Sequence, residues 1–221
     1  AQQPAGAWRA LGMMWRINRR SHRLFAMHLV SLAEAAVLVR WTAAQGVQHI
    51  HTHFGTNSAE VALLARQWGS APYSVTIHGS DEWDRPLQWA LKEKVQHAAF
   101  VVAISSFTRA QLMRWIRLED HDKLHVVHCG VDDSFLQWPA TPVPDVQRFV
   151  CVGRLCKEKG QMLLVEAAHR LSCSGVEFEI VLAGDGEMRP EIERLIESYG
   201  LTGKIRITGW ISSDQVRREI L

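Results

Sequence analysis

The sequence has few of the residues that stabilise disulfide-bonded or metal-dependent domains. Its 221 residues include only four cysteines, none of them in a C-x-x-C pair or beside histidines at zinc-finger spacing. We therefore expect reduced core thiols, no structural metal and no redox motif. The cysteines are Cys129, Cys151, Cys156 and Cys173.

Strong charge and long apolar runs are also lacking. The formal net charge is only +2, far from the basic excess that is typical of nucleic-acid-binding proteins. We find no stretch with the roughly 20 uninterrupted apolar residues of a membrane-spanning helix. The N-terminus also lacks the pattern of a secretory signal peptide. These absences predict a cytoplasmic chain with no nucleic-acid partner.

Short β-branched runs alternate with helical patterns along most of the chain. Amphipathic segments separate the strand patterns QHIHTH, YSVTIH, FVVAIS and LHVVH, which predicts an α/β fold with a parallel sheet covered by helices. A second series, FVCVG, FEIVLAG and KIRITG, predicts a second sheet of the same kind. Between the two lies WPATPVPD, whose three prolines suit an exposed connector.

We therefore expect two Rossmann-like domains, residues 1–138 and 148–221, joined by a linker at 139–147. Four strands in the first sheet and three in the second are few for doubly wound domains. A helical stretch rather than a strand precedes the first sheet, and the chain stops inside a helix. The interpretation is a chain truncated at both ends.

The segment FVCVGRLCKEKG places glycines and cations where a strand gives way to a helix. In open α/β sheets ligands bind at the carboxyl ends of strands, and free N–H groups at a helix N-terminus attract phosphate. Gly153, Arg154 and Lys159 are therefore candidates for binding a diphosphate. A solvated basic loop is the alternative explanation of this spacing.

Two further strands end in glycine. Gly184, Asp185 and Gly186 follow one strand and Gly209 follows the next, so the backbone can approach a base or ribose closely. A tight strand-to-helix turn with a capping aspartate explains the first of these loops equally well.

His78 and Asp81 follow the strand YSVTI. An imidazole there could hydrogen-bond a sugar hydroxyl or a phosphate, and a nearby carboxylate could orient the ring or bind a hydroxyl itself. An ordinary loop histidine is the alternative.

His49, His51 and His53 alternate along another strand, so the three share one face, as metal ligands sometimes do. Because no carboxylate or cysteine lies nearby in the sequence, we reject a metal site in favour of packing or hydrogen bonding. His53, with Phe54 and Gly55, is best placed to reach a ligand.

The segment from Trp8 to Arg23 is basic and amphipathic and contains no acidic residue. It could lie on an anionic membrane surface, but we favour the interpretation of an exposed helical flank.

Seven segments occur together in the order typical of glycosyltransferase family 4. They are HTHFG, SVTIHGSDEW, AISSFTRAQL, VVHCGVDDSF, CVGRLCKEKG, VLAGDGEMRPEIERL and ITGWIS. From about His49 onward the chain resembles this family, and HTHFG is similar to its bacterial exopolysaccharide and colanic-acid branch.

This resemblance implies a GT-B fold, with two Rossmann-like domains facing a cleft. It implies that the enzyme moves a sugar from a nucleoside-diphosphate sugar to a glycan or lipid-linked acceptor with retention of configuration, and needs no metal or other cofactor. It assigns the donor diphosphate to Arg154 and Lys159, and places His78 near the transferred sugar. The implied nucleotide contacts are Asp185, Gly186, Gly209, Trp210 and Ile211, and the implied acceptor side is His53, Phe54 and Gly55.

Two parts of the family's site have no counterpart in this sequence: the glycine-rich loop after the first strand and a later pair of glutamates. A catalytically incomplete nucleotide-binding fragment is therefore the alternative. A nucleotide-sugar epimerase of the same architecture is disfavoured by the transferase motifs.

Overall fold

The computed structural model describes residues 4–21, 23–131, 133–137 and 147–221. The chain divides into two compact units, Ala1–Gly130 and Val131–Leu221, each with its own sheet. The boundary between the two units therefore lies eight residues before residue 138, the expected end of the first domain. The expected linker at 139–147 lies, except for residue 147, outside the described residues and stays a prediction.

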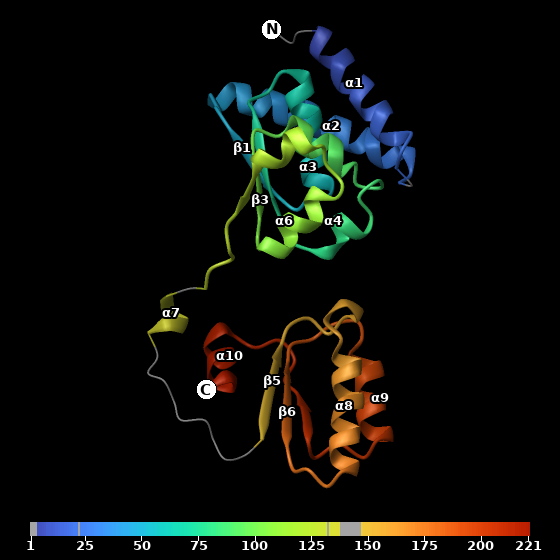
Figure 1. Cartoon of the computed structure of the whole chain (residues 1–221), viewed down its shortest axis with the longest axis vertical. Coiled ribbons are helices and arrows are strands. Elements are labelled where there is room, and N and C mark those ends of the chain that lie inside the picture. The colour runs from blue at the N-terminus through green and yellow to red at the C-terminus, as the bar shows by residue number, and fades with distance from the viewer. Residues whose placement is uncertain (1–3, 22, 132, 138–146) are drawn as a thin grey trace. The chain divides into compact units, whose positions relative to one another are not determined.

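The first unit contains a parallel sheet in the order β1-β2-β3-β4 (Figure 1). Its register sets Ile50 opposite Tyr73, and Val101 opposite both Val75 and Leu124. Since consecutive parallel strands are neighbours and such crossovers are right-handed, the connecting helices pack on one face. The strands are β1 (Ile50–His53), β2 (Tyr73–Ile77), β3 (Val101–Ala103) and β4 (Leu124–Val126); the connecting helices are α3 (Asn57–Trp68), α4 (Ser80–Asp84), α5 (Leu91–His97), α6 (Ser106–Met113) and the 3-10 helix η1 (Leu118–Lys123).

Between this sheet and its helices lies one hydrophobic core, to which α3 contributes Leu63 and Leu64 and the strands contribute Tyr73, Val75 and Val101. All five side chains are fully buried. The predicted four-stranded α/β arrangement is therefore confirmed for this unit.

The opposite face of the sheet is polar. Both ring nitrogens of His51 lie at hydrogen-bond distance from hydroxyls, Nδ1 at 2.7 Å from Ser74 Oγ and Nε2 at 3.0 Å from Thr76 Oγ1. Nε2 of His49 lies 2.8 Å from the same Ser74 hydroxyl. The alternating histidines thus hydrogen-bond within the sheet, as the interpretation that rejected a metal site expects.

Two helices precede the sheet, α1 (Pro4–Asn18) and α2 (Phe25–Gln45), and both pack against α3. No segment has roughly 20 uninterrupted apolar residues, yet α2 is long and apolar enough to cross a membrane by length and composition. This helix has 21 residues, with a mean hydropathy of 1.2 over its most apolar window, of which 22% is buried. Because Glu34 and Arg40 interrupt the run, a search for uninterrupted apolar residues misses it. Core helices of soluble proteins and signal sequences pass the same test.

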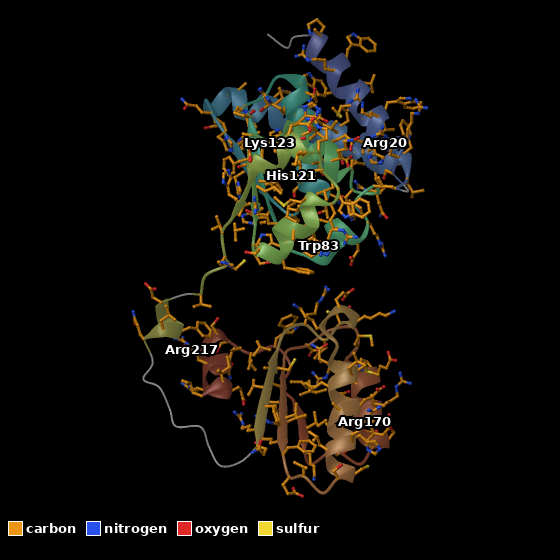
Figure 2. The ribbon with its side chains drawn as sticks, viewed as in Figure 1. Arg20, Trp83, His121, Lys123, Arg170 and Arg217 are labelled. Atoms are coloured by element: carbon orange, nitrogen blue, oxygen red, sulfur yellow. The ribbon has the colours of Figure 1, made fainter. Side chains whose placement is uncertain are left out.

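Buried charges tie these helices to the sheet layer. Glu60 on α3 accepts a hydrogen bond from Arg23 at 2.9 Å and lies 2.7 Å from Nδ1 of His28 on α2. Nearby, Arg20 donates to Glu93 on α5 at 2.8 Å (Figure 2). Glu60 and His28 are almost fully buried, so this cluster is part of the interior.

The second unit contains the parallel sheet β5-β6-β7. Figure 1 shows α8 and α9 on one side of this sheet and α10 on the other. Leu182, Ile192 and Val165 lie in its core. The strands are β5 (Arg148–Val152), β6 (Glu179–Ala183) and β7 (Ile205–Ile207); the helices are α7 (Asp133–Leu136), the 3-10 helix η2 (Lys157–Lys159), α8 (Gln161–Cys173), α9 (Arg189–Ser198) and α10 (Ser213–Ile220).

The short helix α7 belongs to this second unit. The Arg217 guanidinium on α10 lies over the Phe135 ring of α7, 5.2 Å from its centroid (Figure 2). This cation–π interaction helps to hold α7 against α10. The four cysteines are free, but only Cys156 is buried; the expectation of core thiols was wrong for Cys129 and Cys173, which are exposed.

Candidate functional site

The loop between β5 and α8 carries the predicted diphosphate-binding residues. Its last residue, Gly160, has φ +71°, and α8 begins immediately after it without a side-chain cap. The N–H groups of the first helical turn are therefore available for an anion. Arg154 and Lys159 are both exposed on the same loop, and Lys159 lies beside Gly153. The loop thus brings Gly153, both cations and a helix N-terminus together.

Arg154 is held in place through its neighbours. The neighbouring Cys156 side chain, and after it Glu187 and Glu158, favours the charged guanidinium, which raises the pKa of Arg154. Its carbonyl accepts a hydrogen bond from Nε2 of Gln161 at 3.0 Å. Oε1 of Gln161 is buried and has no partner among the described residues. Gln161, which the sequence did not single out, therefore presents an unused acceptor beneath the loop.

Close backbone contacts join this loop to the one that follows β6. A Cβ on Gly184 would lie 2.1 Å from the Gly153 carbonyl oxygen, and one on Gly186 would lie 2.3 Å from that of Leu155. Leu155 N–H donates to Asp185 O at 2.9 Å, and Met188 N–H donates to Leu155 O at 3.1 Å. Only glycine fits at positions 184 and 186, since any side chain would push the two loops apart.

Asp185 is already engaged by its own chain. Its Oδ1 accepts from Gly186 N–H at 2.8 Å and its Oδ2 accepts from Arg189 at 2.7 Å. The hydrogen bond from Gly186 N–H contributes most, and that from Arg189 next, to lowering the pKa of the Asp185 carboxyl group. Gly209, after β7, faces the same pair, because its Cβ would lie 3.5 Å from both Arg189 Nη1 and Asp185 Oδ2.

The predicted nucleotide contacts thus gather at the carboxyl ends of β6 and β7. Trp210 is 74% exposed and Ile211 is half-buried, so an indole face is open beside Gly209. Arg189 is an addition that the sequence analysis missed. The available signal was its position four residues after Asp185, at the start of a helix.

Cys156, Glu158 and Glu187 place three potential ligand atoms within 4.8 Å of one another. The Arg154 guanidinium already interacts with all three of these side chains. A fixed cation in this position competes with a metal ion for the same electron pairs. The chemistry of this group therefore fits arginine better than a divalent metal.

In the first unit, two of the predicted residues meet directly. Nδ1 of His53 lies 2.7 Å from Nε2 of His78, and the rings stack with centroids 5.0 Å apart. The Phe54 ring lies against His78 at 4.8 Å and is 52% exposed. Gly55 is buried behind them. His53 and His78 thus form a pair at the carboxyl ends of β1 and β2.

Asp81 lies in α4, but its side chain is outside what the structure describes, so its catalytic role stays a prediction. Two residues absent from the predicted site lie directly behind the histidine pair. Glu82 accepts a hydrogen bond from Gly55 N–H, and Lys94 donates to the Gly55 carbonyl. Glu82 lies within the SVTIHGSDEW segment but was not singled out, and Lys94 lies outside all the quoted segments, so only the folded chain shows their contribution.

Each unit is a parallel sheet with helices after its strands, and each has its candidate residues at the carboxyl ends of those strands. The family model for Glycosyltransferase Family 4 matches residues 5–135, and the model for Glycosyl transferases group 1 matches residues 136–221. The chain therefore belongs to glycosyltransferase family 4, and its two Rossmann-like units are those of the GT-B fold.

Individual relatives agree with this assignment. The chain is 34% identical over 180 residues to a 2-deoxystreptamine glucosyltransferase from Streptomyces kanamyceticus, covering 69% of this chain and 45% of that protein. It matches the fold of the lipopolysaccharide outer core galactosyltransferase WaaB with a TM-score of 0.63 and 21% identity, covering 85% of this chain and 51% of the other. It matches Anabaena Alr3699/HepE, solved in complex with UDP and glucose, with a TM-score of 0.62 and 19% identity, covering 80% and 51%. The chain thus spans about half the length of these proteins.

Proposed function

We propose that this chain is part of a retaining glycosyltransferase that moves a sugar from a nucleoside-diphosphate sugar to a glycan or lipid-linked acceptor. The observation that carries the proposal is the loop of Gly153, Arg154 and Lys159 at the uncapped start of α8. Such a loop neutralises a diphosphate, and the charge on a diphosphate grows as it leaves a sugar. The UDP and glucose in the Anabaena structure support a donor of this class.

In the proposed reaction, the bond between the anomeric carbon and the diphosphate oxygen breaks and its electron pair leaves with the nucleotide. The acceptor hydroxyl oxygen forms the new bond on the same face, and its proton passes to the departing phosphate. Arg154 and Lys159 stabilise the charge on that phosphate. His78, oriented by His53, hydrogen-bonds the transferred sugar, and no metal or other cofactor is required.

The nucleotide is proposed to lie on the loops after β6 and β7. Gly184 and Gly186 let the loop after β6 pack against Gly153 and Leu155, Gly209 lies beside Asp185, and the exposed Trp210 offers a flat apolar surface to a base. Asp185, fixed by Arg189, presents its remaining acceptor capacity to a ribose hydroxyl. His53, Phe54 and Gly55 are proposed to lie on the acceptor side.

Calorimetric titration of the chain with UDP and GDP in the presence of EDTA tests the donor half. Each of Arg154→Ala and Lys159→Ala should weaken binding about 10- to 100-fold, since a charge-assisted hydrogen bond contributes about 1.5–3 kcal/mol. Lys157→Ala is the matched control, because Lys157 is an exposed cation of the same loop that the proposal leaves out. Equal losses of affinity in all three variants would mean that the loop acts only as a general basic patch and not as a specific diphosphate site.

The alternative function is that of a nucleotide-binding fragment without catalysis. Both functions predict nucleotide binding, and only the first predicts transfer. A radiolabelled donor incubated with a lipid-linked glycan separates them when both this chain and a version of the relatives' length are assayed. Sugar released to water without transfer would favour the fragment.

A bacterial polysaccharide pathway, of the exopolysaccharide or colanic-acid type, is the setting we propose. The HTHFG segment supports it, as does the likeness in fold to WaaB, a lipopolysaccharide outer core galactosyltransferase. The proposed location is the cytoplasmic side of the cell membrane, where nucleotide sugars are made. Comparing glycans from cells with and without the gene tests the pathway.

Peripheral contact with an anionic membrane through α1 and α2 is part of this proposal. The fully buried positions of α2 carry small or polar residues, and Leu32, Leu38 and Val39 pack partly buried against the core, whereas several other large apolar residues are exposed. Six of the chain's 25 Lys and Arg residues, but only one of its 23 Asp and Glu residues, lie in the first 45 positions. Apolar and basic surface together favour an anionic bilayer. The buried residues are His28, Ser31, Ala35 and Thr42, and the exposed ones include Phe25, Leu29, Val30, Val37 and Trp41.

Sedimentation with vesicles tests this contact. The chain should bind vesicles of phosphatidylglycerol and phosphatidylcholine and lose binding in 0.5 M salt or in pure phosphatidylcholine. The double variant Trp8→Ala, Trp41→Ala should bind less, while Leu118→Ala, an equally exposed change on η1, should not. No binding to anionic vesicles by the folded chain would rule out a membrane as the occupant of this surface.

A further inference from the structure

Two buried ionisable side chains converge on the short turn from Phe54 to Thr56, which directly follows β1. Lys94 Nζ donates to Gly55 O at 2.8 Å and to Thr56 O at 2.7 Å. Oε1 of Glu82 accepts from Gly55 N–H at 3.0 Å. Lys94 and Glu82 are each only 1% exposed. The backbone of one turn is therefore held by a buried lysine amino group and a buried carboxylate.

Burial of these groups is costly. A charged side chain loses several kcal/mol of hydration when it leaves water, and this loss is offset only by well-formed hydrogen bonds. Lys94 directs two of its three donors at the carbonyls of this turn. A surface loop could satisfy the same carbonyls with water, so two buried side chains are needed only if the turn must keep one conformation.

That conformation is strained. Phe54 has φ +66°, a left-handed value that costs a residue with a Cβ roughly 1–2 kcal/mol. Its N–H still donates to Thr76 O at 2.8 Å, so the chain leaves the sheet abruptly at this residue. The strained backbone holds the Phe54 ring against His78 and lies directly after His53, which pairs with His78.

Gly55 is required for the same arrangement. A Cβ at this position would lie 2.7 Å from Cδ1 of Ile77 and 3.0 Å from Cγ of Glu82. The turn is thus packed tightly against β2 and α4. On α4, the ring next to Glu82 is Trp83, which packs edge-on against Phe107 (Figure 2).

We propose that Lys94 and Glu82 are positioning residues that hold the Phe54–Thr56 turn and thereby fix the His53–His78 pair. The part this pair takes in sugar transfer rests on the proposed function. An N–H···N hydrogen bond has one donor and one acceptor, so it couples the tautomers of the two rings. Whether His78 Nδ1 carries a proton then follows from the tautomer of His53. Lys94 and Glu82 act through the turn and do not touch the substrate.

Nuclear magnetic resonance on the folded chain tests the proposal without a substrate. The hydrogen bond between the two rings should give a through-bond ¹⁵N–¹⁵N coupling between His53 Nδ1 and His78 Nε2. Lys94→Met keeps the side-chain length but removes the donors, and should abolish this coupling. Lys92→Met, the same change at an exposed position of α5, should leave it intact.

Glu82 provides a second pair of variants. Glu82→Gln keeps an oxygen that accepts from Gly55 N–H and should retain the coupling, whereas Glu82→Leu should lose it. The proposal is overturned if the coupling persists in folded Lys94→Met or in folded Glu82→Leu. If Lys94 and Glu82 contributed only to general stability, Lys94→Met and Glu82→Leu would lower the unfolding midpoint and leave the coupling unchanged.

The unmodified chain provides a measurement that does not depend on whether the variants fold. The Gly55 amide should exchange with solvent as slowly as the core strands of this unit, because Glu82 holds it. Exchange on the timescale of exposed loops would overturn the proposal. If the coupling behaves as expected but UDP and GDP do not bind, the positioning role stands and the proposed function fails.

Discussion

Nδ1 of His53 and Nε2 of His78 lie 2.7 Å apart, which joins two motifs that are 25 residues apart in the sequence. The contact requires one ring to be the donor and the other the acceptor. It therefore links the protonation state of a residue on the predicted acceptor side to that of the predicted catalytic histidine.

Replacing His53 with phenylalanine should show whether the hydrogen bond from His53, and not only the contact between the rings, orients His78. His53→Phe keeps an aromatic ring beside His78 and removes the nitrogen partner, so the His78 ring should show a mixture of tautomers in its ¹⁵N chemical shifts. In an enzyme of the relatives' length, His78→Ala should lower the transfer rate by on the order of 10²-fold. A single unchanged tautomer of His78 in His53→Phe would show that another group orients it.

Gly184→Ala should destabilise the second unit strongly. The new Cβ would lie 2.1 Å from the Gly153 carbonyl oxygen, and φ at this position is +155°. Overpacking and backbone strain together predict a loss of about 2–4 kcal/mol in the free energy of unfolding. Gly203→Ala is the matched control, since its Cβ would have no atom within 4 Å and the change should stay within about 0.5 kcal/mol. Urea denaturation of both variants gives the comparison.

Lys94 should make the stability of the first unit depend on pH. Burial lowers its pKa from 10.5 to about 7, while Glu60, Glu82 and Glu93 raise it and Arg23 lowers it further. Between pH 7 and 10.5 the unfolded chain binds a proton that the folded chain lacks, so the free energy of unfolding rises with pH, by at most about 1.4 kcal/mol per unit. This contribution is complete above pH 10.5 and is lost as the pH falls through 7.

Urea midpoints at pH 7 and pH 9 test this dependence. The rise between the two should be clear in the unmodified chain and in Lys92→Met, and should be absent in Lys94→Met. Equal rises in all three proteins would assign the effect to another group.

Glu60→Ala should destabilise the first unit by about 3–5 kcal/mol, because it leaves Arg23 and His28 without their buried partner. Glu34→Ala, an exposed change on α2, should cost less than about 0.5 kcal/mol. Thermal unfolding followed by circular dichroism checks the pair. Similar small effects for the two variants would mean that solvent reaches the cluster.

The sheets could be predicted because their strands are short β-branched runs bounded by glycine and polar residues. Val75 and Val101, for example, fall inside the predicted strands and are fully buried in the core. The loops at Gly153 and Gly184 could be located as strand-end turns because glycine and cations mark them locally, and their binding role stays a prediction. The close packing of Gly184 against the Gly153 carbonyl could be seen only in the folded chain.

Lys94 and Glu82 could not be predicted for a physical reason. Both are ordinary charged residues on helical segments, and such residues usually face water. Their burial depends on the position of residues 54–56, which are 26 or more positions away along the chain. The helical stretch before the first sheet was expected, but the apolar character of α2 was missed because Glu34 and Arg40 interrupt its apolar run.

The polar face of the first sheet also has a consequence for folding. Successive side chains of β1 point to opposite faces, so a shift of one residue in its pairing with β2 would turn His51 and His53 into the core and Thr52 outward. The hydroxyls of Ser74 and Thr76 would then lose their imidazole partners. The histidines of β1 therefore favour the native strand register. A shifted register would bury their imidazoles without hydrogen-bond partners, whereas the native register provides those partners.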